Sequence, residues 1–377
     1  MVRAMRIVQL TSTSAGGVAR HARQVAGLLA DAGEEVLLAG PADVVAESPV
    51  PVAVVDIADR PRPSDVAALK RLRGVLAGTD LVHAHGLRAG AAAVLATRAM
   101  RGRPAVVVTL HNLPVGGPRV QAVAAVLERV VARGADLVLG VSGDLVARAT
   151  RLGASAQRAL VPAPARTETG PLDDAARQQL RASLGLTPQE RFVLTVGRLA
   201  PQKGLGLLAD TAATLVRSGA PAFRWVVVGD GPLAGELAER VRAESLPVVV
   251  AGRRDDVTAL NAIADVVVST STWEGQPLAV QEALQAGAAV VATDVGGTRE
   301  VTADAAVLVP PQAEQLAAAV ARLLTDDAER ARLRSAARER ASRLPTPEDV
   351  VAQLRDVYAR AVVPQRTRGT DRTRPTD

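Results

Sequence analysis

The segment FVLTVGRLAPQKG, which runs from Phe192 to Gly204, decides the fold of this chain. It opens with an apolar run rich in β-branched residues, typical of a strand that is buried on both faces of a parallel sheet. The glycine-flanked loop that follows carries Arg198 and Lys203, and a helical pattern begins near Leu205. Lys203 is one of two lysines among 45 basic residues, so its place here is unusual. Two cations at the end of a parallel strand indicate a site for a diphosphate.

Short β-branched runs alternate with alanine- and leucine-rich helical stretches along the whole chain, which predicts parallel α/β architecture. The predicted strands of the first half are Arg6 to Thr11, Val36 to Ala39, Val52 to Asp56, Leu81 to His85, Val106 to His111 and Leu137 to Val141. Those of the second half are Phe192 to Val196, Trp225 to Val228, Val248 to Ala251, Val266 to Ser269, Ala289 to Ala292 and Ala306 to Val309.

A segment rich in proline, glycine, threonine and charge, Val161 to Glu190, separates the two series of strands. We therefore predict an N-terminal domain of residues 1–165, a flexible linker of residues 166–190 and a C-terminal domain of residues 191–345. Thr346 suits an N-cap and Pro347 the first helical position, which predicts a last helix over residues 346–363. Residues 364–377 are polar and lack apolar periodicity, so we expect a disordered tail.

The net charge of +6 raises the question of nucleic-acid binding. The arginines are scattered, however, and the chain has five aromatic residues in all, too few for a platform on which bases stack. The absence of cysteine excludes disulfides and thiolate chemistry. No apolar stretch approaches the roughly 18 residues of a membrane span. We expect a cytoplasmic enzyme with no nucleic-acid partner, and contact with the inner face of the membrane stays open.

A second motif, WEGQPLAVQEA, places Glu274 and Glu282 on either side of a helix start. Pro277 suits the first position of a helix from Leu278 to Ala286, which Gly287 ends. Ahead of this helix, backbone amides approach phosphate oxygens readily. Glu282 lies more than one turn inside this helix, and its carboxylate can accept hydrogen bonds from two hydroxyl groups at once. Taken alone, the two glutamates would be ordinary surface charges.

With the downstream run TDVGG from Thr293, these motifs resemble the nucleotide-sugar site of retaining glycosyltransferases of family 4, which have the GT-B fold. The resemblance implies two Rossmann-like domains that face each other across a cleft, and a C-terminal helix that crosses back to the first domain. It also implies that Glu282 binds the ribose hydroxyls and that Glu274 lies near the donor sugar. Gly275, Gln276, Pro277 and Leu278 would border the diphosphate, although proline removes one amide donor.

The turn GDGPLAG, which starts at Gly229, looks at first like a dinucleotide fingerprint. Its glycine spacing is wrong, and the next strand ends in Ala251, Gly252 and Arg253 where a ribose-binding acidic residue is needed. The resembling family carries the same turn. The resemblance implies that Gly229 borders the nucleotide in this chain.

In the first half, Gly16 and Gly17 join the first strand to a helix over Val18 to Ala32, and paired glycines allow a ligand close to the backbone. His111 stands at the end of a strand, in a Thr-x-His context. The resemblance implies that the glycine loop lies opposite the donor diphosphate and that His111 approaches the transferred sugar. A histidine bonded to a loop carbonyl is the alternative.

His83 and His85 point to one side of their strand, so a zinc site of His83, His85 and His111 is a further alternative. No carboxylate motif completes it, and the Asp-x-Asp motif of metal-dependent glycosyltransferases is absent. We expect no metal and no cofactor beyond the nucleotide-sugar co-substrate. The helix from Arg119 to Arg133 has a broad valine face, which we expect to pack on the sheet, with lipid contact as the alternative.

The sequence thus predicts a metal-independent retaining glycosyltransferase, with Arg198, Lys203, Glu274 and His111 as catalytic residues. The cations would neutralise the departing diphosphate. The acceptor is a hydroxyl of a small molecule, glycan or lipid. A nucleotide-sugar epimerase of the same fold and a non-catalytic sugar-nucleotide binding module remain as alternatives.

Overall fold

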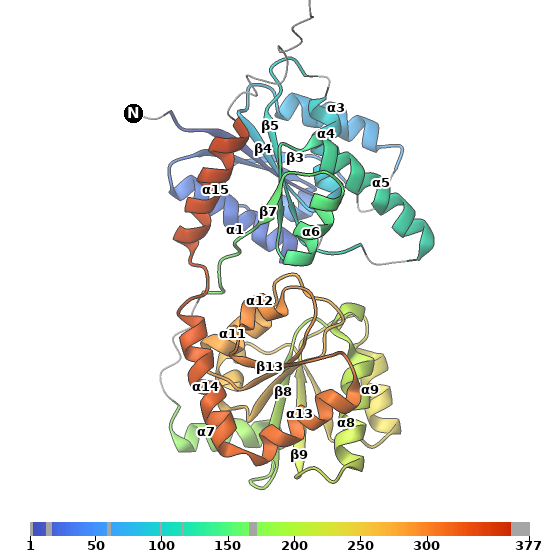
Figure 1. Ribbon diagram of the computed structural model, residues 1–377, viewed down its shortest axis with the longest axis vertical. Helices are drawn as coiled ribbons and strands as arrows, with labels where there is room; N and C mark the ends of the chain where they lie inside the picture. The colour runs from blue at the N-terminus through green and yellow to red at the C-terminus, as the bar shows by residue number, and fades with distance from the viewer. Residues whose placement is uncertain are drawn as a thin grey trace, which may run out of the picture. The chain divides into compact units, whose positions relative to one another are not determined.

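The computed structural model describes residues 3–12, 17–58, 62–98, 100–114, 117–165 and 172–362. The chain forms two compact units (Figure 1). The first unit comprises Met1–Val161 with Pro347–Asp377, and the second comprises Pro162–Thr346. The predicted tail of residues 364–377 lies outside the described residues.

The first unit contains a seven-stranded sheet in the order β3-β2-β1-β4-β5-β6-β7, and every pairing in it is parallel. Its strands are β1 (Arg6–Thr11), β2 (Glu35–Gly40), β3 (Val52–Val54), β4 (Leu81–His85), β5 (Ala105–Leu110), β6 (Leu137–Gly140) and β7 (Ala156–Arg158). Its helices are α1 (Gly17–Asp31), α2 (Ala42–Val45), α3 (Asp65–Val75), α4 (Leu87–Thr97), α5 (Pro118–Gly134) and α6 (Gly143–Arg151), joined by the C-terminal helix α15 (Pro347–Val362).

The second unit contains a six-stranded parallel sheet in the order β10-β9-β8-β11-β12-β13. Its strands are β8 (Arg191–Val196), β9 (Phe223–Val228), β10 (Val248–Gly252), β11 (Val266–Ser269), β12 (Val290–Thr293) and β13 (Ala306–Val309). Its helices are α7 (Asp174–Ser183), η1 (Pro201–Lys203), α8 (Leu205–Arg217), α9 (Ala234–Ala243), α10 (Val257–Ile263), α11 (Leu278–Gln285), α12 (Thr298–Thr302), α13 (Ala313–Thr325) and α14 (Asp327–Ala341).

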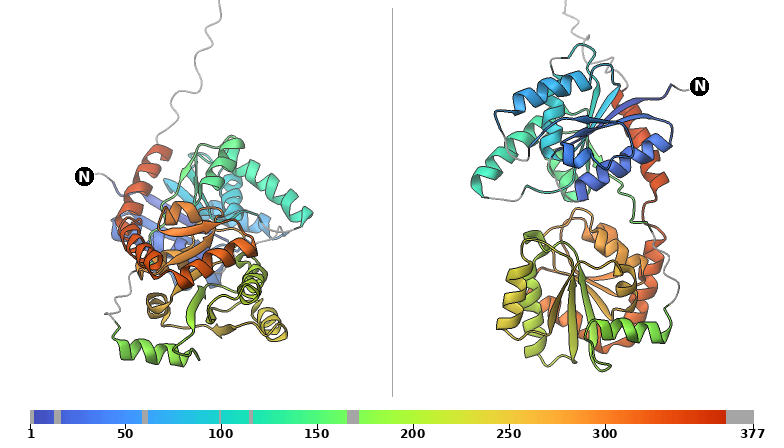
Figure 2. Two further views of the ribbon diagram at one scale, coloured as in Figure 1. Left: turned by 60° about the horizontal axis from the view of Figure 1, so that its bottom comes forward. Right: turned by 180° about the vertical axis from the view of Figure 1, so that it is seen from behind.

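Both sheets are doubly wound, and helices cover the two faces of each (Figure 2). On β8, Val193 belongs to the core on one face, and Phe192 and Leu194 belong to the core on the other. Burial on both faces explains why this strand reads as an unbroken apolar run. The strand order reverses between β1 and β4 in the first unit and between β8 and β11 in the second. Ligands of such sheets bind beyond the carboxyl ends of the strands at these switch points.

Helix α15 returns to the first unit, as predicted. Tyr358 is 1% exposed there and accepts a hydrogen bond of 3.1 Å from Gln9 of β1. The amide of Gln353 bonds the backbone of Arg158 and Leu160. The C-terminal segment therefore completes the core of the first unit.

The predicted flexible linker is wrong for most of its length. Within it, Asp173 caps helix α7 by accepting from the Ala176 N–H at 2.7 Å. Leu184 and Leu186 are then buried in the core of the second unit. A polar, proline-rich composition hid these anchors, because α7 itself buries none of its residues. Residues 166–171 of the predicted linker lie outside the described residues.

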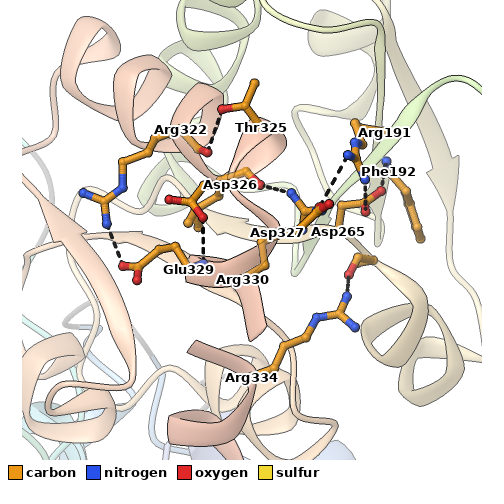
Figure 3. Close-up of polar contacts among 12 residues, drawn as sticks. Arg191, Phe192, Asp265, Arg322, Thr325, Asp326, Asp327, Glu329, Arg330 and Arg334 are labelled. Carbon is orange, nitrogen blue, oxygen red and sulfur yellow. Dashed lines mark hydrogen bonds and ion pairs between the residues drawn. The ribbon is translucent and has the colours of Figure 1, made fainter. Parts of the chain in front are cut away.

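A charged cluster joins α14 to the start of β8 (Figure 3). Asp265 accepts from the Phe192 N–H at 2.7 Å and lies 3.4 Å from the guanidinium of Arg191. Arg191 also pairs with Asp327 at 3.5 Å, and Asp327 pairs with the buried Arg330. This cluster lies at the amino end of β8, opposite the end that carries Arg198, so its role is to hold α14 against the sheet.

Candidate active site

The loop after β8 is fixed to the segment after β11 by hydrogen bonds. Thr270 Oγ1 donates to the carbonyl of Lys203 at 2.9 Å, and the Thr272 N–H donates to the carbonyl of Gln202 at 2.8 Å. Gly204 ends the loop with φ of +61°, where a Cβ would lie 2.1 Å from the carbonyl oxygen of Thr270. Glycine is therefore required for the approach of these two segments at the switch point.

Lys203 and Glu274, which the sequence assigns to different parts of the donor, form an ion pair. The Nζ of Lys203 lies 2.5 Å from Oε1 of Glu274, and their side chains are 21% and 10% exposed. The same Oε1 accepts from the Ser271 hydroxyl at 2.6 Å. The charges are held in one geometry and partly shielded from water, which strengthens their attraction to each other.

The backbone around Glu274 is also held. The Gly297 N–H donates to the Glu274 carbonyl at 2.8 Å, and Thr293 Oγ1 donates to the Ser271 carbonyl at 2.6 Å. Gly296 has φ of +52°, and a Cβ there would lie 2.0 Å from the Glu274 carbonyl oxygen. The run TDVGG therefore supports the loop that carries Glu274.

A pocket lies at the carboxyl ends of β8 and β11. Of the predicted site residues, those in its wall are Arg198, Lys203, Glu274 and Pro277. Arg198 is exposed, and among the described residues its guanidinium has no hydrogen-bond or ion-pair partner. A cation so placed is available to an anionic ligand.

Helix α11 begins at Leu278, so Pro277 is its N-cap and not its first residue, which corrects the prediction by one position. The Pro277 carbonyl accepts from the N–H groups of Val280 and Gln281, both at 3.1 Å. Gly275 is buried, and Gln276 is half-buried. Glu282 lies in the second turn, half-buried and outside the pocket wall. Glu282 thus follows the lining residue Val280 closely in the sequence, but Glu282 itself does not line the pocket.

Gly229 lies beside the loop that carries Arg198. Its N–H donates to the Gly252 carbonyl at 2.8 Å. Its φ is +138°, and a Cβ there would lie 1.9 Å from the carbonyl oxygen of Gly197. The geometry requires glycine for packing, so it leaves the predicted nucleotide contact of Gly229 untested.

The other predicted residues belong to the first unit. Gly17 is the exposed first residue of α1, and Gly16 lies outside the described residues. His111 follows β5 directly, with Nε2 at 3.3 Å from Nδ1 of His85. This contact joins two histidine rings, so it differs from the predicted alternative in which His111 bonds a loop carbonyl. His111 is half-buried, and burial, followed by the neighbouring His21 and His83, holds its pKa well below its usual range.

His83 and His85 share one side of β4, as the strand period predicts, with ring centroids 4.5 Å apart. Both nitrogens of His83 are bonded, Nδ1 to Tyr358 and Nε2 to Thr109, each at 2.7 Å. Burial, with a smaller effect of His21, lowers the pKa of His83 to about 3. His83 is therefore a structural histidine, and the alternative of a zinc site made of His83, His85 and His111 has no available nitrogen on His83.

Sequence reasoning missed several residues that build these sites. Ser271 orients Glu274, and its place three residues before Glu274 was an available signal. His21, Gln9 and Tyr358 join the other histidines only through tertiary packing, and no local pattern marks them.

The comparisons with known proteins agree with this geometry. The profile described as Glycosyl transferases group 1 matches residues 176–340, and the one described as Glycosyl transferase 4-like domain matches residues 16–164. Phosphatidyl-myo-inositol mannosyltransferase of Mycolicibacterium smegmatis is 30% identical over 91% of this chain and 90% of its own. The chain belongs to the GT4-type glycosyltransferases. D-inositol 3-phosphate glycosyltransferase of Jonesia denitrificans is likewise 30% identical, over 75% of this chain and 72% of its own.

Solved structures confirm the fold. HepE of Anabaena, crystallised in complex with UDP, superposes with a TM-score of 0.76 at 22% identity, over 94% of this chain and 100% of its own. Sucrose-phosphate synthase of Thermosynechococcus elongatus gives a TM-score of 0.73 at 25% identity, over 94% and 98%. The glycosyltransferase has the GT-B fold. Both matching profiles describe transferases and give no support to the epimerase alternative.

Helix α5 differs from its prediction. Its Val131 is buried, but Val120, Val123 and Val126 are 46%, 41% and 58% exposed. Packing therefore uses the carboxyl half of the valine face and leaves the amino half open. Among the described helices, none has both the length and the apolarity to cross a bilayer.

Proposed function

We propose that this glycosyltransferase transfers a sugar with retention of anomeric configuration, from a nucleoside-diphosphate donor to an acceptor hydroxyl. The observation that carries the proposal is the pocket beyond β8 and β11, with the free cation of Arg198 and the fixed pair of Lys203 and Glu274 in its wall. The UDP complex of the structurally similar HepE supports a nucleotide ligand.

In the proposed reaction the bond between the anomeric carbon and the β-phosphate oxygen breaks, and its electron pair stays on that oxygen. The acceptor oxygen bonds the anomeric carbon on the same face and gives its proton to the departing phosphate. Arg198 and Lys203 stabilise the charge that grows on the diphosphate, a preorganised electrostatic effect that commonly dominates catalysis. Glu274 lies at the donor sugar, Glu282 accepts from the ribose hydroxyls and His111 approaches the transferred sugar.

No metal takes part at the diphosphate in this proposal, because Arg198 and Lys203 supply the positive charge. Transfer should therefore continue in excess chelator. A loss of activity in chelator that zinc, manganese or magnesium restores would contradict this part of the proposal.

The acceptor belongs to the class of small molecules, glycans or lipids with a free hydroxyl. Two relatives carry inositol phosphate or phosphatidyl-inositol in their names, so these compounds open the acceptor panel. The open valine face of α5, flanked by exposed Arg119 and Arg129, supports peripheral contact with an anionic membrane.

The test is turnover of UDP-glucose, GDP-mannose and other nucleotide sugars with that panel, followed by NMR of the anomeric proton in the product. A product with the donor's configuration supports retention. An inverted product contradicts the mechanism, and nucleotide-sugar binding without any turnover across the panel favours the non-catalytic alternative.

A further inference from the structure

Three imidazoles of the first unit converge at the switch point between β1 and β4. They come from separate elements, His21 from α1, His85 from β4 and His111 from the residue after β5. One nitrogen of each lies within 4.8 Å of the others. Within the described part of the chain no further His, Cys, Asp or Glu joins this group.

The spacing of two of these nitrogens suits a shared metal ion. His85 Nδ1 and His111 Nε2 are 3.3 Å apart, which is also within hydrogen-bond range. Two nitrogens bound to zinc at about 2.0–2.1 Å in a tetrahedron lie roughly 3.3–3.4 Å apart. A zinc ion could therefore replace the proton between these rings without moving them apart.

The second ring nitrogen of His85 makes the kind of hydrogen bond that metal-bound histidines usually make through their other nitrogen. Its Nε2 lies 2.7 Å from Oε1 of Gln9. An amide oxygen accepts only, so Nε2 carries the proton and Nδ1 presents its lone pair towards His111. Metal-bound histidines typically donate their other N–H to a carbonyl or carboxylate in this way. Gln9 is itself fixed by Tyr358, to which it donates at 3.1 Å.

His21 supplies an unused nitrogen. Its side chain is buried, and Nδ1 has no hydrogen-bond partner among the residues that the structure describes. A buried polar atom without a partner costs free energy, which a bound ion would recover. The rings of His21 and His111 are 5.1 Å apart between centroids. The three ligand nitrogens lie within 4.8 Å of one another, so a tetrahedral spacing requires a shift of at most roughly 1.4 Å, within reach of a side-chain adjustment.

An imidazole binds a metal ion through the lone pair of an unprotonated ring nitrogen. His83 lies nearby but is excluded as a ligand, because Tyr358 and Thr109 occupy both of its nitrogens.

We propose that His21, His85 and His111 form a binding site for one divalent transition-metal ion of the zinc class, with Gln9 orienting His85. Three imidazoles leave the fourth position to water or to a hydroxyl-bearing ligand, the arrangement of an open zinc site. The residues of this site all belong to the first unit. His111 is the one residue that the site shares with the proposed transfer reaction, so the test below measures metal uptake and not turnover.

The test uses the full chain without a histidine tag, stripped of metal by chelation. Calorimetric titration with zinc chloride should show one equivalent bound, and Co²⁺ should give the visible absorption of a tetrahedral site. His21→Gln and His111→Gln should each weaken binding by at least about tenfold, because even outer-shell losses reach that size. His83→Gln is the matched control within the same network, and it should retain the one-equivalent site.

Circular dichroism and thermal melts establish that each variant is folded before titration, and His111→Gln is the safer substitution because His111 is half-buried. Zinc uptake at one equivalent that is lost in both ligand variants and kept in His83→Gln supports the proposal. No uptake by the unaltered chain overturns it. Uptake that is undiminished in folded His21→Gln and His111→Gln also overturns it, because the ion then binds elsewhere.

Discussion

Replacing Lys203 by methionine tests whether this lysine serves the diphosphate or merely its neighbour Glu274. Methionine keeps much of the length of the side chain and removes the charge. The carboxylate of Glu274, 10% exposed, would then keep the Ser271 hydroxyl as a side-chain partner. Both stability and ligand binding should fall, for different reasons.

The stability loss follows from the broken ion pair. Leaving one charge of a fully buried pair without its partner costs about 3–5 kcal/mol. The Lys203 side chain is 21% exposed, and water screens part of this effect, so we expect about 2–3 kcal/mol. For a unit of this size such a loss lowers the melting temperature by roughly 4–12 °C.

The functional loss follows from the missing cation. A charged hydrogen bond to the diphosphate contributes about 1.5–3 kcal/mol, so UDP affinity should fall roughly 10- to 150-fold. Turnover should fall at least about a hundredfold, the size seen when one preorganised electrostatic group is removed. Calorimetry and a donor-turnover assay, both run below the melting temperature of the variant, measure these losses.

Glu274→Gln and the double variant separate the two roles. The double variant has no unpaired carboxylate, so most of the stability should return while UDP affinity stays low. Glu274→Gln alone should bind UDP no more weakly than the unaltered chain, because it removes a negative charge from the pocket. Recovery of both stability and UDP affinity in the double variant would refute the diphosphate role of Lys203.

Four further expectations concern other parts of the molecule. Arg198→Ala should lower turnover at least about a hundredfold with an unchanged melting temperature, since the Arg198 side chain is exposed and has no partner among the described residues. Near-normal kinetics would remove Arg198 from the site. Glu282→Ala should weaken UDP binding at least about tenfold in calorimetry, for the loss of a charged acceptor. Gly296→Ala should lower the free energy of unfolding by about 1–3 kcal/mol in denaturant titrations and should impair turnover, because the added Cβ would meet the Glu274 carbonyl. Gly206→Ala is the control: no atom lies within 4 Å of a Cβ at that position, so stability and turnover should both be unchanged. The double variant Val123→Asp and Val126→Asp should reduce sedimentation with anionic vesicles, whereas Val216→Asp, on the exposed surface of the second unit, should not.

The sequence predicted the strands well because parallel strands buried on both faces leave continuous β-branched runs. The strand it missed, β7, reads Ala-Gln-Arg and has no such residue. Helix α7 was missed because it has no buried face of its own, and the anchors Leu184 and Leu186 follow it. These errors occur where tertiary contacts, and not local pattern, decide the structure.

The sites show the same division. The loop of Arg198 and Lys203 was predictable because strand, loop and helix are consecutive in the chain. The contact of Lys203 with Glu274 was not, since it depends on β8 and β11 being neighbours in the sheet. The strand period placed His83 and His85 on one side, but it could not tell which had free nitrogens, because Tyr358 and Thr109 come from distant elements.

Both candidate sites arise from one feature of doubly wound sheets. Where the strand order reverses, the connections from two neighbouring strands leave in opposite directions, and side chains beyond the strand ends meet without helices covering them. In the second unit this place gathers a cation pair and a carboxylate, which suit a diphosphate. In the first unit it gathers neutral imidazoles, which suit a transition metal. The same backbone geometry thus serves two different ligands, and the side chains at each switch point decide which one binds.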